Sequence, residues 1–243
     1  ISGYRAVIEA GHAFGRFFAG QVTAAGKVPP AKVFVIGTGV AGLAAIGTAG
    51  SLGAEVYATD VRPETAEQVE SMGAKFLTVA QDDQGVSSDG YAKATTADYA
   101  ERAAELYAQQ ARTVDIIITT AAIPGRPSPK LITAEMVASM RAGSVIVDLA
   151  ASGGGNCELT RPGEVVDAHG VAIHGPLNLA ATMPVHASQL YARNVTELLN
   201  AFVKDGALAI DLSDEVIAGA CVTHAGEVVN EAVRAALTAG KSA

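Results

Sequence analysis

The feature that most constrains the fold of this chain is a set of three glycines directly after a short apolar run. Lys32 to Ile36 is rich in β-branched and aromatic residues, and Gly37, Gly39 and Gly42 follow it at the spacing G-x-G-x-x-G. An Ala-rich apolar segment comes next. The pattern predicts a strand, a tight turn and a helix in that order.

Each glycine has a physical role in such a turn. Gly37 permits the turn out of the strand, Gly39 lets a cofactor pyrophosphate approach the backbone, and Gly42 lets the helix pack closely on the strands. The pyrophosphate then meets N–H groups at the positive end of the helix dipole. The spacing alone is weak evidence, because glycines in an Ala-rich segment often serve only close packing.

An acidic residue at the expected distance strengthens this interpretation. The predicted strand from Glu55 to Thr59 ends on Asp60, about 20 residues past the glycines, where the fingerprint calls for an acid that accepts hydrogen bonds from the adenosine ribose. Arg62 leaves NADP as an alternative, since an arginine there can hold a 2′-phosphate. Asp60 would repel that phosphate, so the sequence favours NAD.

The remaining residues up to 185 continue an alternation of helices and strands. The predicted elements are helices over Gly3 to Ala19, Arg62 to Met72, Lys93 to Arg112 and Thr133 to Met140, and strands over Lys75 to Val79, Val114 to Ile118, Ser144 to Leu149 and Val171 to His174. Right-handed crossovers make such strands parallel. We therefore predict an α/β fold, a doubly wound parallel sheet of Rossmann type, over residues 1–185.

Three loops are candidates for contact with a ligand. In an open parallel sheet the loops after the first and fourth strands face each other where the strand order reverses, so Thr119 to Gly125 is predicted to form the second wall of the crevice. The Gly-rich loop from Ala151 to Cys157 is either a further contact or a flexible connector. Ala80 to Tyr91 is unusually long, so it is functional, mobile or a plain solvated loop. His174 is expected to be a partly buried histidine, not a catalytic base.

The last segment of the chain changes character. Pro184 to Val203 predicts a long amphipathic helix, Leu208 to Leu212 and Gly219 to Val229 predict short strands, and Glu231 to Ala239 predicts a closing helix. We expect residues 186–243 to be a return segment that packs on a domain this sequence does not contain in full. The chain begins at Ile1 without a methionine, which suggests a fragment.

Composition argues against several classes of protein. The formal net charge of −8 over 243 residues argues against nucleic acid or an anionic membrane as a partner. Two separated cysteines, Cys157 and Cys221, provide neither a disulfide framework nor a zinc ribbon, and no metal site is predicted. Residues 33–54 carry no charge, but their glycines and built-in turn argue against a membrane span.

Eight motifs together resemble one known family. They are GYRAVIEA (Gly3 to Ala10), TAAGKVPPAKV (Thr23 to Val33), GTGVAGL (Gly37 to Leu43), ATDVRPETAEQVESMG (Ala58 to Gly73), GYAK (Gly90 to Lys93), TTAAIPGRPSPKLIT (Thr119 to Thr133), GSVIVDLA (Gly143 to Ala150) and GGNCELT (Gly154 to Thr160). They resemble the NAD(H)-binding peripheral component of proton-translocating NAD(P) transhydrogenases, which are relatives of alanine dehydrogenase.

The resemblance implies a component that binds NADH and passes hydride to NADP⁺ held by a partner component. It also implies coupling to proton movement through a membrane component, a homodimer, and a place on the cytoplasmic face of a bacterial inner membrane, or the matrix side in a eukaryote. No side chain need act as acid or base in direct hydride transfer, so no catalytic residue is predicted, and the chain is not expected to be active alone.

Site residues are implied by the same resemblance. It places Thr38, Gly39 and Val40 at the pyrophosphate, Asp60, Val61 and Arg62 around the adenosine ribose, Ala122 in the opposite wall, and Gly90 and Tyr91 on a flap formed by Ala80 to Tyr91. Two departures are visible. The family's residues that hold the nicotinamide end have no match in this sequence, and the flap is shorter, with Ala103 where relatives have a glutamine.

Two other functions stay open at this point. An alanine dehydrogenase shares the fold and several motifs, although residues 80–112 resemble an insertion that alanine dehydrogenases lack. A module that binds NAD(H) without chemistry of its own is the third interpretation.

Overall fold

A seven-stranded sheet is the centre of the larger of two units, Ile1–Thr182 and Met183–Ala243. The structure is a computed structural model, and it describes residues 1–79, 97–123 and 125–239. The domain boundary predicted after residue 185 stays a prediction. Each unit is described separately below.

Six neighbouring strands of this sheet are parallel, and the edge strand β8 is antiparallel. The strands are β3 (Lys32–Ile36), β4 (Glu55–Thr59), β5 (Lys75–Phe76), β6 (Ile116–Thr119), β7 (Val145–Asp148), β8 (Val165–Ala168) and β9 (Val171–His174). Their order is β5-β4-β3-β6-β7-β9-β8. The α/β fold with a doubly wound, mostly parallel sheet is thus confirmed.

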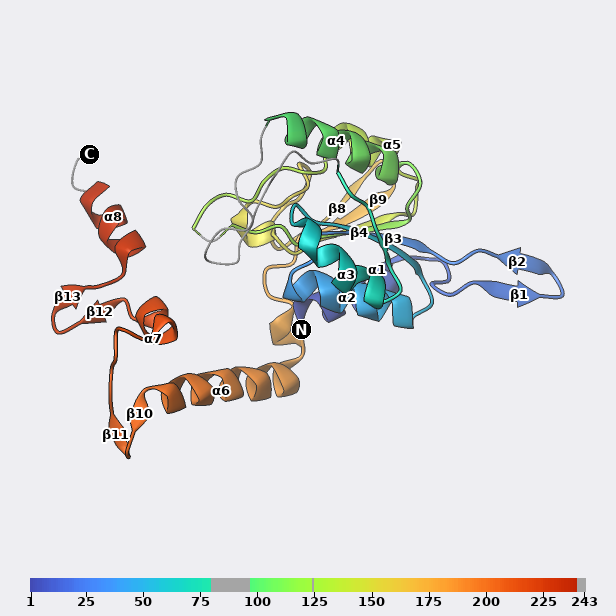
Figure 1. Cartoon of the computed structure of the whole chain (residues 1–243). Helices are drawn as coiled ribbons and strands as arrows, with labels where there is room; N and C mark the ends of the chain where they lie inside the picture. Colours follow the sequence, from blue (N-terminus) through green and yellow to red (C-terminus); the bar gives the residue numbers. More distant parts are fainter. Residues whose placement is uncertain (80–96, 124, 240–243) are drawn as a thin grey trace. The chain divides into compact units, whose positions relative to one another are not determined.

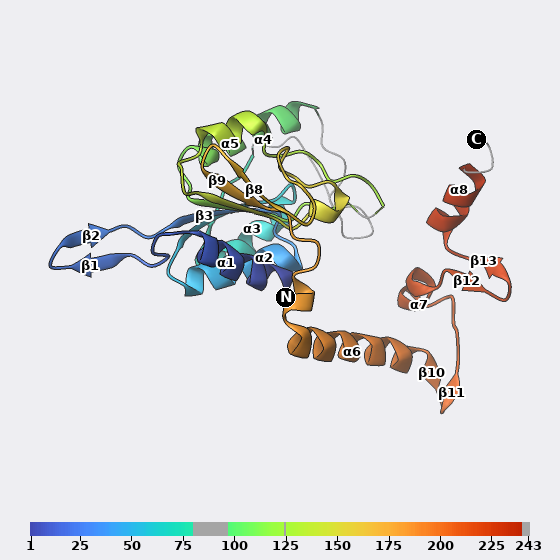
Figure 2. The ribbon, with the colours of Figure 1, turned by 180° about the vertical axis from the view of Figure 1, so that it is seen from behind.

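Helices cover both faces of the sheet (Figures 1 and 2). One face carries α1 (Ser2–Ala13), α2 (Val40–Ser51) and α3 (Ala66–Ser71), and the other carries α4 (Ala97–Ala111) and α5 (Ala134–Ser139). Short 3₁₀ turns lie at Pro63–Thr65, Ala151–Gly153 and Ala180–Thr182.

The central strands supply both layers of the core because they are apolar on both sides, as buried parallel strands are. Alternation along β3 sends Val33 and Val35 to the cluster with α1 and α2, and Phe34 and Ile36 to the cluster with α4 and α5. Gly3 allows α1 to cross α2 closely, since a Cβ there would lie 1.8 Å from the carbonyl oxygen of Ala41.

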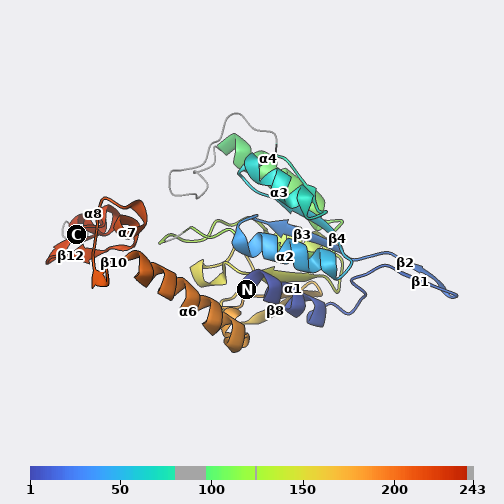
Figure 3. The same cartoon turned by 60° about the horizontal axis from the view of Figure 1, so that its bottom comes forward.

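Several predicted elements differ from the structure. The helix expected over Gly3 to Ala19 ends at Ala13, and the helix expected over Arg62 to Met72 is a 3₁₀ turn followed by α3. The strand expected over Lys75 to Val79 pairs over two residues only. Sequence analysis also missed β8 and the hairpin of β1 (Gln21–Thr23) and β2 (Gly26–Val28), which projects away from the sheet in Figures 1 to 3.

The second unit is made of helices and two-residue strands. It contains α6 (Pro184–Ala201), β10 (Val203–Lys204), β11 (Ala207–Leu208), α7 (Glu215–Ala220), β12 (Thr223–His224), β13 (Glu227–Val228) and α8 (Glu231–Ala239). The strand predicted over Leu208 to Leu212 is wrong apart from its first residue. The segment predicted as a broken strand from Gly219 includes the end of α7 and the hairpin β12–β13, with Ala225 and Gly226 at positive φ in its turn.

Candidate nucleotide-binding crevice

The site lies at the carboxyl edge of the sheet, between β3 and β6. The chain leaves β3 into α2 on one face and leaves β6 toward α5 on the other (Figure 1). The strand order therefore reverses between these two neighbours, and ligands of open α/β sheets bind at such a point.

The glycine turn after β3 has the geometry that its sequence predicts. Gly37 has φ +94°, a conformation that favours glycine, and a Cβ on Gly42 would lie 1.9 Å from the carbonyl oxygen of Gly37. A Cβ on Gly39 would meet only Arg62 Nη2, at 4.0 Å. The backbone at Gly39 is therefore open to a group from outside, whereas Gly37 and Gly42 are needed for packing within the protein.

The amino terminus of α2 is suited to an anion. Gly39 is the N-cap and provides no side-chain hydrogen bond to the first turn of this 12-residue helix, and Val40 is 87% exposed. Uncapped N–H groups and the helix dipole favour a phosphate there. The residues present thus fit a pyrophosphate beside Thr38, Gly39 and Val40.

Asp60 lies at the end of β4 and organises the loop next to it. Its carboxylate accepts hydrogen bonds from the Thr38 backbone N–H (2.7 Å), the Thr38 hydroxyl (3.0 Å) and the Arg62 backbone N–H (2.9 Å). It also accepts two from the Arg62 side chain, from Nε at 2.9 Å and from Nη2 at 3.0 Å. Val61 packs on the core cluster of α4 and α5.

The Asp60 carboxylate is therefore covered by the Arg62 guanidinium. Its side chain is 5% exposed and that of Arg62 is 22% exposed. Burial acts to raise the pKa of Asp60, but the hydrogen bonds from the Arg62 side chain and from the Thr38 and Arg62 backbones outweigh it, so the pKa is lowered. The sequence suggested opposite effects on a 2′-phosphate, which Arg62 could hold and Asp60 would repel, and the structure shows the two side chains as an ion pair.

The loop after β6 faces the glycine turn and is bonded to it. The Thr120 backbone N–H donates to the Ile36 carbonyl at 2.9 Å, and the Thr120 hydroxyl lies 3.1 Å from the Gly37 carbonyl. A Cβ on Gly37 would lie 2.4 Å from that hydroxyl. Ala122 and Ile123, which follow, are exposed at the surface of this wall.

Two buried polar residues hold this wall in place, and sequence analysis singled out neither, although it named the loop from Ala151 to Cys157 as a candidate contact. Asp148, at the end of β7, and Asn156, in the Gly-rich loop after it, are both fully buried, and their polar atoms bond to the loops around the crevice. A carboxylate inside an otherwise apolar predicted strand is the signal that could have marked Asp148.

Some predicted features lie outside the site or outside the described residues. Gly90 and Tyr91, with the rest of the proposed flap, are not among residues 1–79, 97–123 and 125–239. Within those ranges, His, Cys, Asp and Glu side chains form no group of three that could hold a metal ion.

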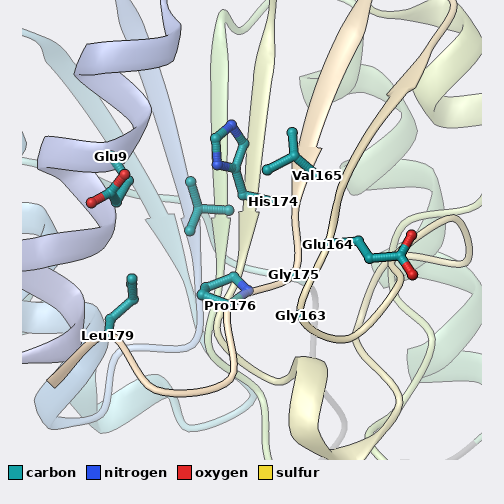
Figure 4. Close-up of a pocket in the computed structure, with 9 residues that line it drawn as sticks. Glu9, Gly163, Glu164, Val165, His174, Gly175, Pro176 and Leu179 are labelled. Atoms are coloured by element: carbon teal, nitrogen blue, oxygen red, sulfur yellow. The ribbon is translucent and has the colours of Figure 1, made fainter. Parts of the chain in front are cut away.

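His174 lines a separate pocket of about 190 Å³ between α1 and strands β8 and β9 (Figure 4). It is half-buried as predicted, and burial lowers its pKa. Its Nε2 atom has no hydrogen-bond partner among the residues that the structure describes. Glu9 on α1 also lines this pocket, and its carboxylate pairs with Arg5.

Comparison with known proteins gives a consistent set of similarities. The family described as "Alanine dehydrogenase/PNT, C-terminal domain" matches residues 6–231. The NAD(P) transhydrogenase subunit alpha of Haemophilus influenzae is 59% identical over 232 residues, which are 94% of this chain and 45% of that protein. The NAD(P) transhydrogenase subunit alpha of Cereibacter sphaeroides is 54% identical over 235 residues, again 94% of this chain and 45% of that protein.

Two solved structures extend the comparison. The transhydrogenase from Sinorhizobium meliloti matches with a TM-score of 0.78 and 47% identity, over 93% of this chain and 60% of that one. An L-alanine dehydrogenase matches with a TM-score of 0.73 and 25% identity, over 98% of this chain and 62% of that one. The chain thus spans between 45% and 62% of the length of these four relatives.

Proposed function

The chain belongs to the alanine dehydrogenase/PNT C-terminal domain family, and from this premise we propose that its first unit binds NAD(H) and donates hydride from NADH to NADP⁺ on a partner component. The observation that carries the proposal is the open backbone at Gly39 beside the uncapped amino terminus of α2. The high identity to proteins named NAD(P) transhydrogenase subunit alpha supports it.

In this proposal different residues of the crevice bind different parts of the dinucleotide. Thr38, Gly39 and Val40 receive the pyrophosphate, and Asp60 with Arg62 receives the adenosine ribose. Because Arg62 covers the Asp60 carboxylate, a ribose hydroxyl reaches that carboxylate only if the guanidinium shifts.

The same proposal gives roles to both sides of the crevice. Val61 lies beside the ribose, Ala122 belongs to the opposite wall, and Gly90 and Tyr91 close over the bound nucleotide.

The chemistry needs no acid or base from the chain. Bound NADH supplies a hydride from C4 of its nicotinamide, and the hydride forms the C4–H bond of NADPH as NADP⁺ is reduced and NADH becomes NAD⁺. The contribution of this chain is to orient the dinucleotide and to exclude water from the transfer.

Partners and location follow from the same proposal. We place the chain with an NADP-binding component and a membrane component whose proton movement is coupled to the redox step, on the cytoplasmic face of a bacterial inner membrane or the mitochondrial matrix side. None of the helices that the structure describes combines the length and the apolar character of a membrane-crossing helix.

We also propose a homodimer. The hairpin β1–β2 supports this, since it projects from the sheet (Figure 3) with Val22 78% exposed and Val28 42% exposed.

Alanine dehydrogenase activity is the second candidate, supported by the similarity to the L-alanine dehydrogenase structure. The experiment that separates the candidates supplies tritium on the transferable hydrogen of NADH, together with NADP⁺ and the NADP-binding component of a transhydrogenase. Transfer of the label to NADPH that requires this chain supports the proposal. A second reaction supplies the chain with L-alanine and NAD⁺. Label that stays on NADH in the first reaction, together with NADH formed in the second, overturns the proposal in favour of the dehydrogenase.

A further inference from the structure

Asn156 is a buried amide that bonds to both backbone groups of one residue in the crevice wall. Its Oδ1 accepts from the Ala121 N–H at 3.1 Å, and its Nδ2 donates to the Ala121 carbonyl at 2.8 Å. Nδ2 also donates to the Pro129 carbonyl at 2.8 Å. Asn156 has 0% exposure, and these three bonds use both Nδ2 donors and one of the two lone pairs of Oδ1.

Asn156 is itself held from two directions. Its backbone carbonyl accepts from the N–H groups of Leu131 and Ile132, at 2.7 and 3.0 Å. The next residue, Cys157, donates its N–H to the Asp148 carboxylate at 3.0 Å. Buried polar groups whose donors are paired rigidify the structure around them, so the amide is a rigid support.

The Asp148 carboxylate completes the support. Besides Cys157 it accepts from the Thr160 hydroxyl at 2.6 Å, from the Ala150 N–H at 3.1 Å and from the Thr119 hydroxyl at 3.0 Å. It is 0% exposed. One carboxylate thus ties the end of β6 to the loop that carries Asn156.

The strand order decides which half of a dinucleotide meets Ala121. Asp60 follows β4, the glycine turn follows β3, Ala121 follows β6 and Asn156 follows β7, and these strands are neighbours in that order. A dinucleotide with its adenosine ribose at Asp60 and its pyrophosphate at the glycine turn places its nicotinamide half beside Ala121 and Ala122. The wall that Asn156 holds is therefore the wall of the nicotinamide half.

We infer that Asn156 is a positioning residue, which sets the backbone at Ala121 for the nicotinamide half of the dinucleotide while leaving the adenosine half to the glycine turn and Asp60. The inference rests on the proposed function. Asn156 touches no reacting atom and acts only through the Ala121 loop.

The test compares two ligands on the purified chain, NADH and 5′-AMP, because 5′-AMP contains only the adenosine half. The variants are Asn156→Ala and Asn156→Asp, which keeps the shape and the acceptor but removes both Nδ2 donations. Asn194→Ala, at an exposed position of α6, is the control. Circular dichroism first establishes that each variant is folded.

The expected result is a rise of about tenfold in the Kd of NADH for both Asn156 variants, with the Kd of 5′-AMP unchanged within about twofold. An equal rise in the Kd of both ligands would assign Asn156 a general structural role and overturn the inference. Unchanged binding of both would overturn it as well. A wild-type chain that binds neither ligand overturns the proposed function instead.

Hydrogen exchange tests the support without any ligand. In the wild-type chain the Ala121 amide, bonded to Asn156, should exchange slowly, as should the Thr120 amide, bonded to the Ile36 carbonyl. Asn156→Ala should accelerate exchange at Ala121 by about tenfold or more and leave Thr120 protected. An Ala121 amide that exchanges freely in the wild type would overturn the inference even if no variant folds.

Discussion

Replacing Asp60 by alanine tests how much the glycine turn depends on this one carboxylate. The change removes the acceptor of five hydrogen bonds, which come from two groups of Thr38 and three of Arg62. Thr38 is 1% exposed, so its N–H loses its partner and finds no water. The Arg62 side chain is 22% exposed and can turn to solvent.

The expected loss of unfolding free energy follows from these two exposures. A buried N–H left without an acceptor costs about 1–3 kcal/mol, and a partly solvated ion pair adds up to about 1 kcal/mol. We therefore expect Asp60→Ala to lower the unfolding free energy by about 1–4 kcal/mol. Asp60→Asn, which keeps one acceptor oxygen, should lose about half as much.

Urea unfolding followed by far-ultraviolet circular dichroism measures this loss, because the chain has no tryptophan to report by fluorescence. Glu64→Ala, at a neighbouring exposed acid, is the matched control and should leave the midpoint unchanged. A loss below about 1 kcal/mol for Asp60→Ala would refute the argument that the buried Thr38 N–H depends on the carboxylate.

Three further predictions follow from the same geometry. Gly37→Ala should destabilise the chain by about 2–4 kcal/mol, because φ is +94° and the new Cβ would lie 2.4 Å from the Thr120 hydroxyl. The control Gly50→Ala, in α2 with open space around it, should instead stabilise the chain slightly. Similar urea midpoints for the two variants would be evidence against backbone strain at Gly37. Arg62→Gln should raise the ratio of Kd for NADPH to Kd for NADH by about tenfold, since Asp60 then faces the 2′-phosphate without its cation. Fluorescence titration measures this ratio, and an unchanged ratio would contradict a role for Arg62 in offsetting the repulsion between Asp60 and the 2′-phosphate. Acid should weaken the fold through Asp60: its folded pKa lies below the ordinary 3.8, so its contribution is present above that value and is lost as pH falls through the lower folded pKa. Urea midpoints between pH 5 and pH 2.5 should fall less in Asp60→Ala than in the wild type, and parallel curves would exclude this linkage.

The buried strands were predictable because their signals are local. Lys32–Ile36, Glu55–Thr59 and Val171–His174 have the same bounds in the sequence prediction and in the structure. Lys32–Ile36 is a near-continuous apolar run that is buried over its last four residues, Glu55–Thr59 alternates half-buried and buried residues over its first four, and glycine lies close to both. The strand β8, with alternate residues exposed, lies at an edge where burial imposes no such run, so it was missed.

The hairpin β1–β2 escaped prediction for a related reason. Its residues are exposed or half-exposed in this chain, so no core imposes an apolar alternation on them. Gly26, with φ +128°, is the one local sign of its turn, and a single glycine in a segment that also contains prolines indicates only a loop.

The candidate site was predictable where a known spacing or the rule for open sheets applies, as for Asp60 and for Thr119 to Gly125, but its hydrogen bonds were not. The turn at Gly37, Gly39 and Gly42 is a local pattern. The bond between Thr38 and Asp60 spans 22 residues, and that between Ala121 and Asn156 spans 35. Such pairs are brought together by the order of strands in the sheet, which no window of sequence contains.

Equilibrium binding of NADH and of NADPH to the purified chain tests the central claim most directly, with the fluorescence of the reduced nicotinamide as the signal. The account predicts saturable binding of NADH and binding of NADPH that is at least about tenfold weaker, because Asp60 repels the 2′-phosphate even beside Arg62. Equal affinity for the two, or no binding of NADH, would contradict the assignment of the crevice between Gly39, Asp60 and Ala122 as an NAD(H) site.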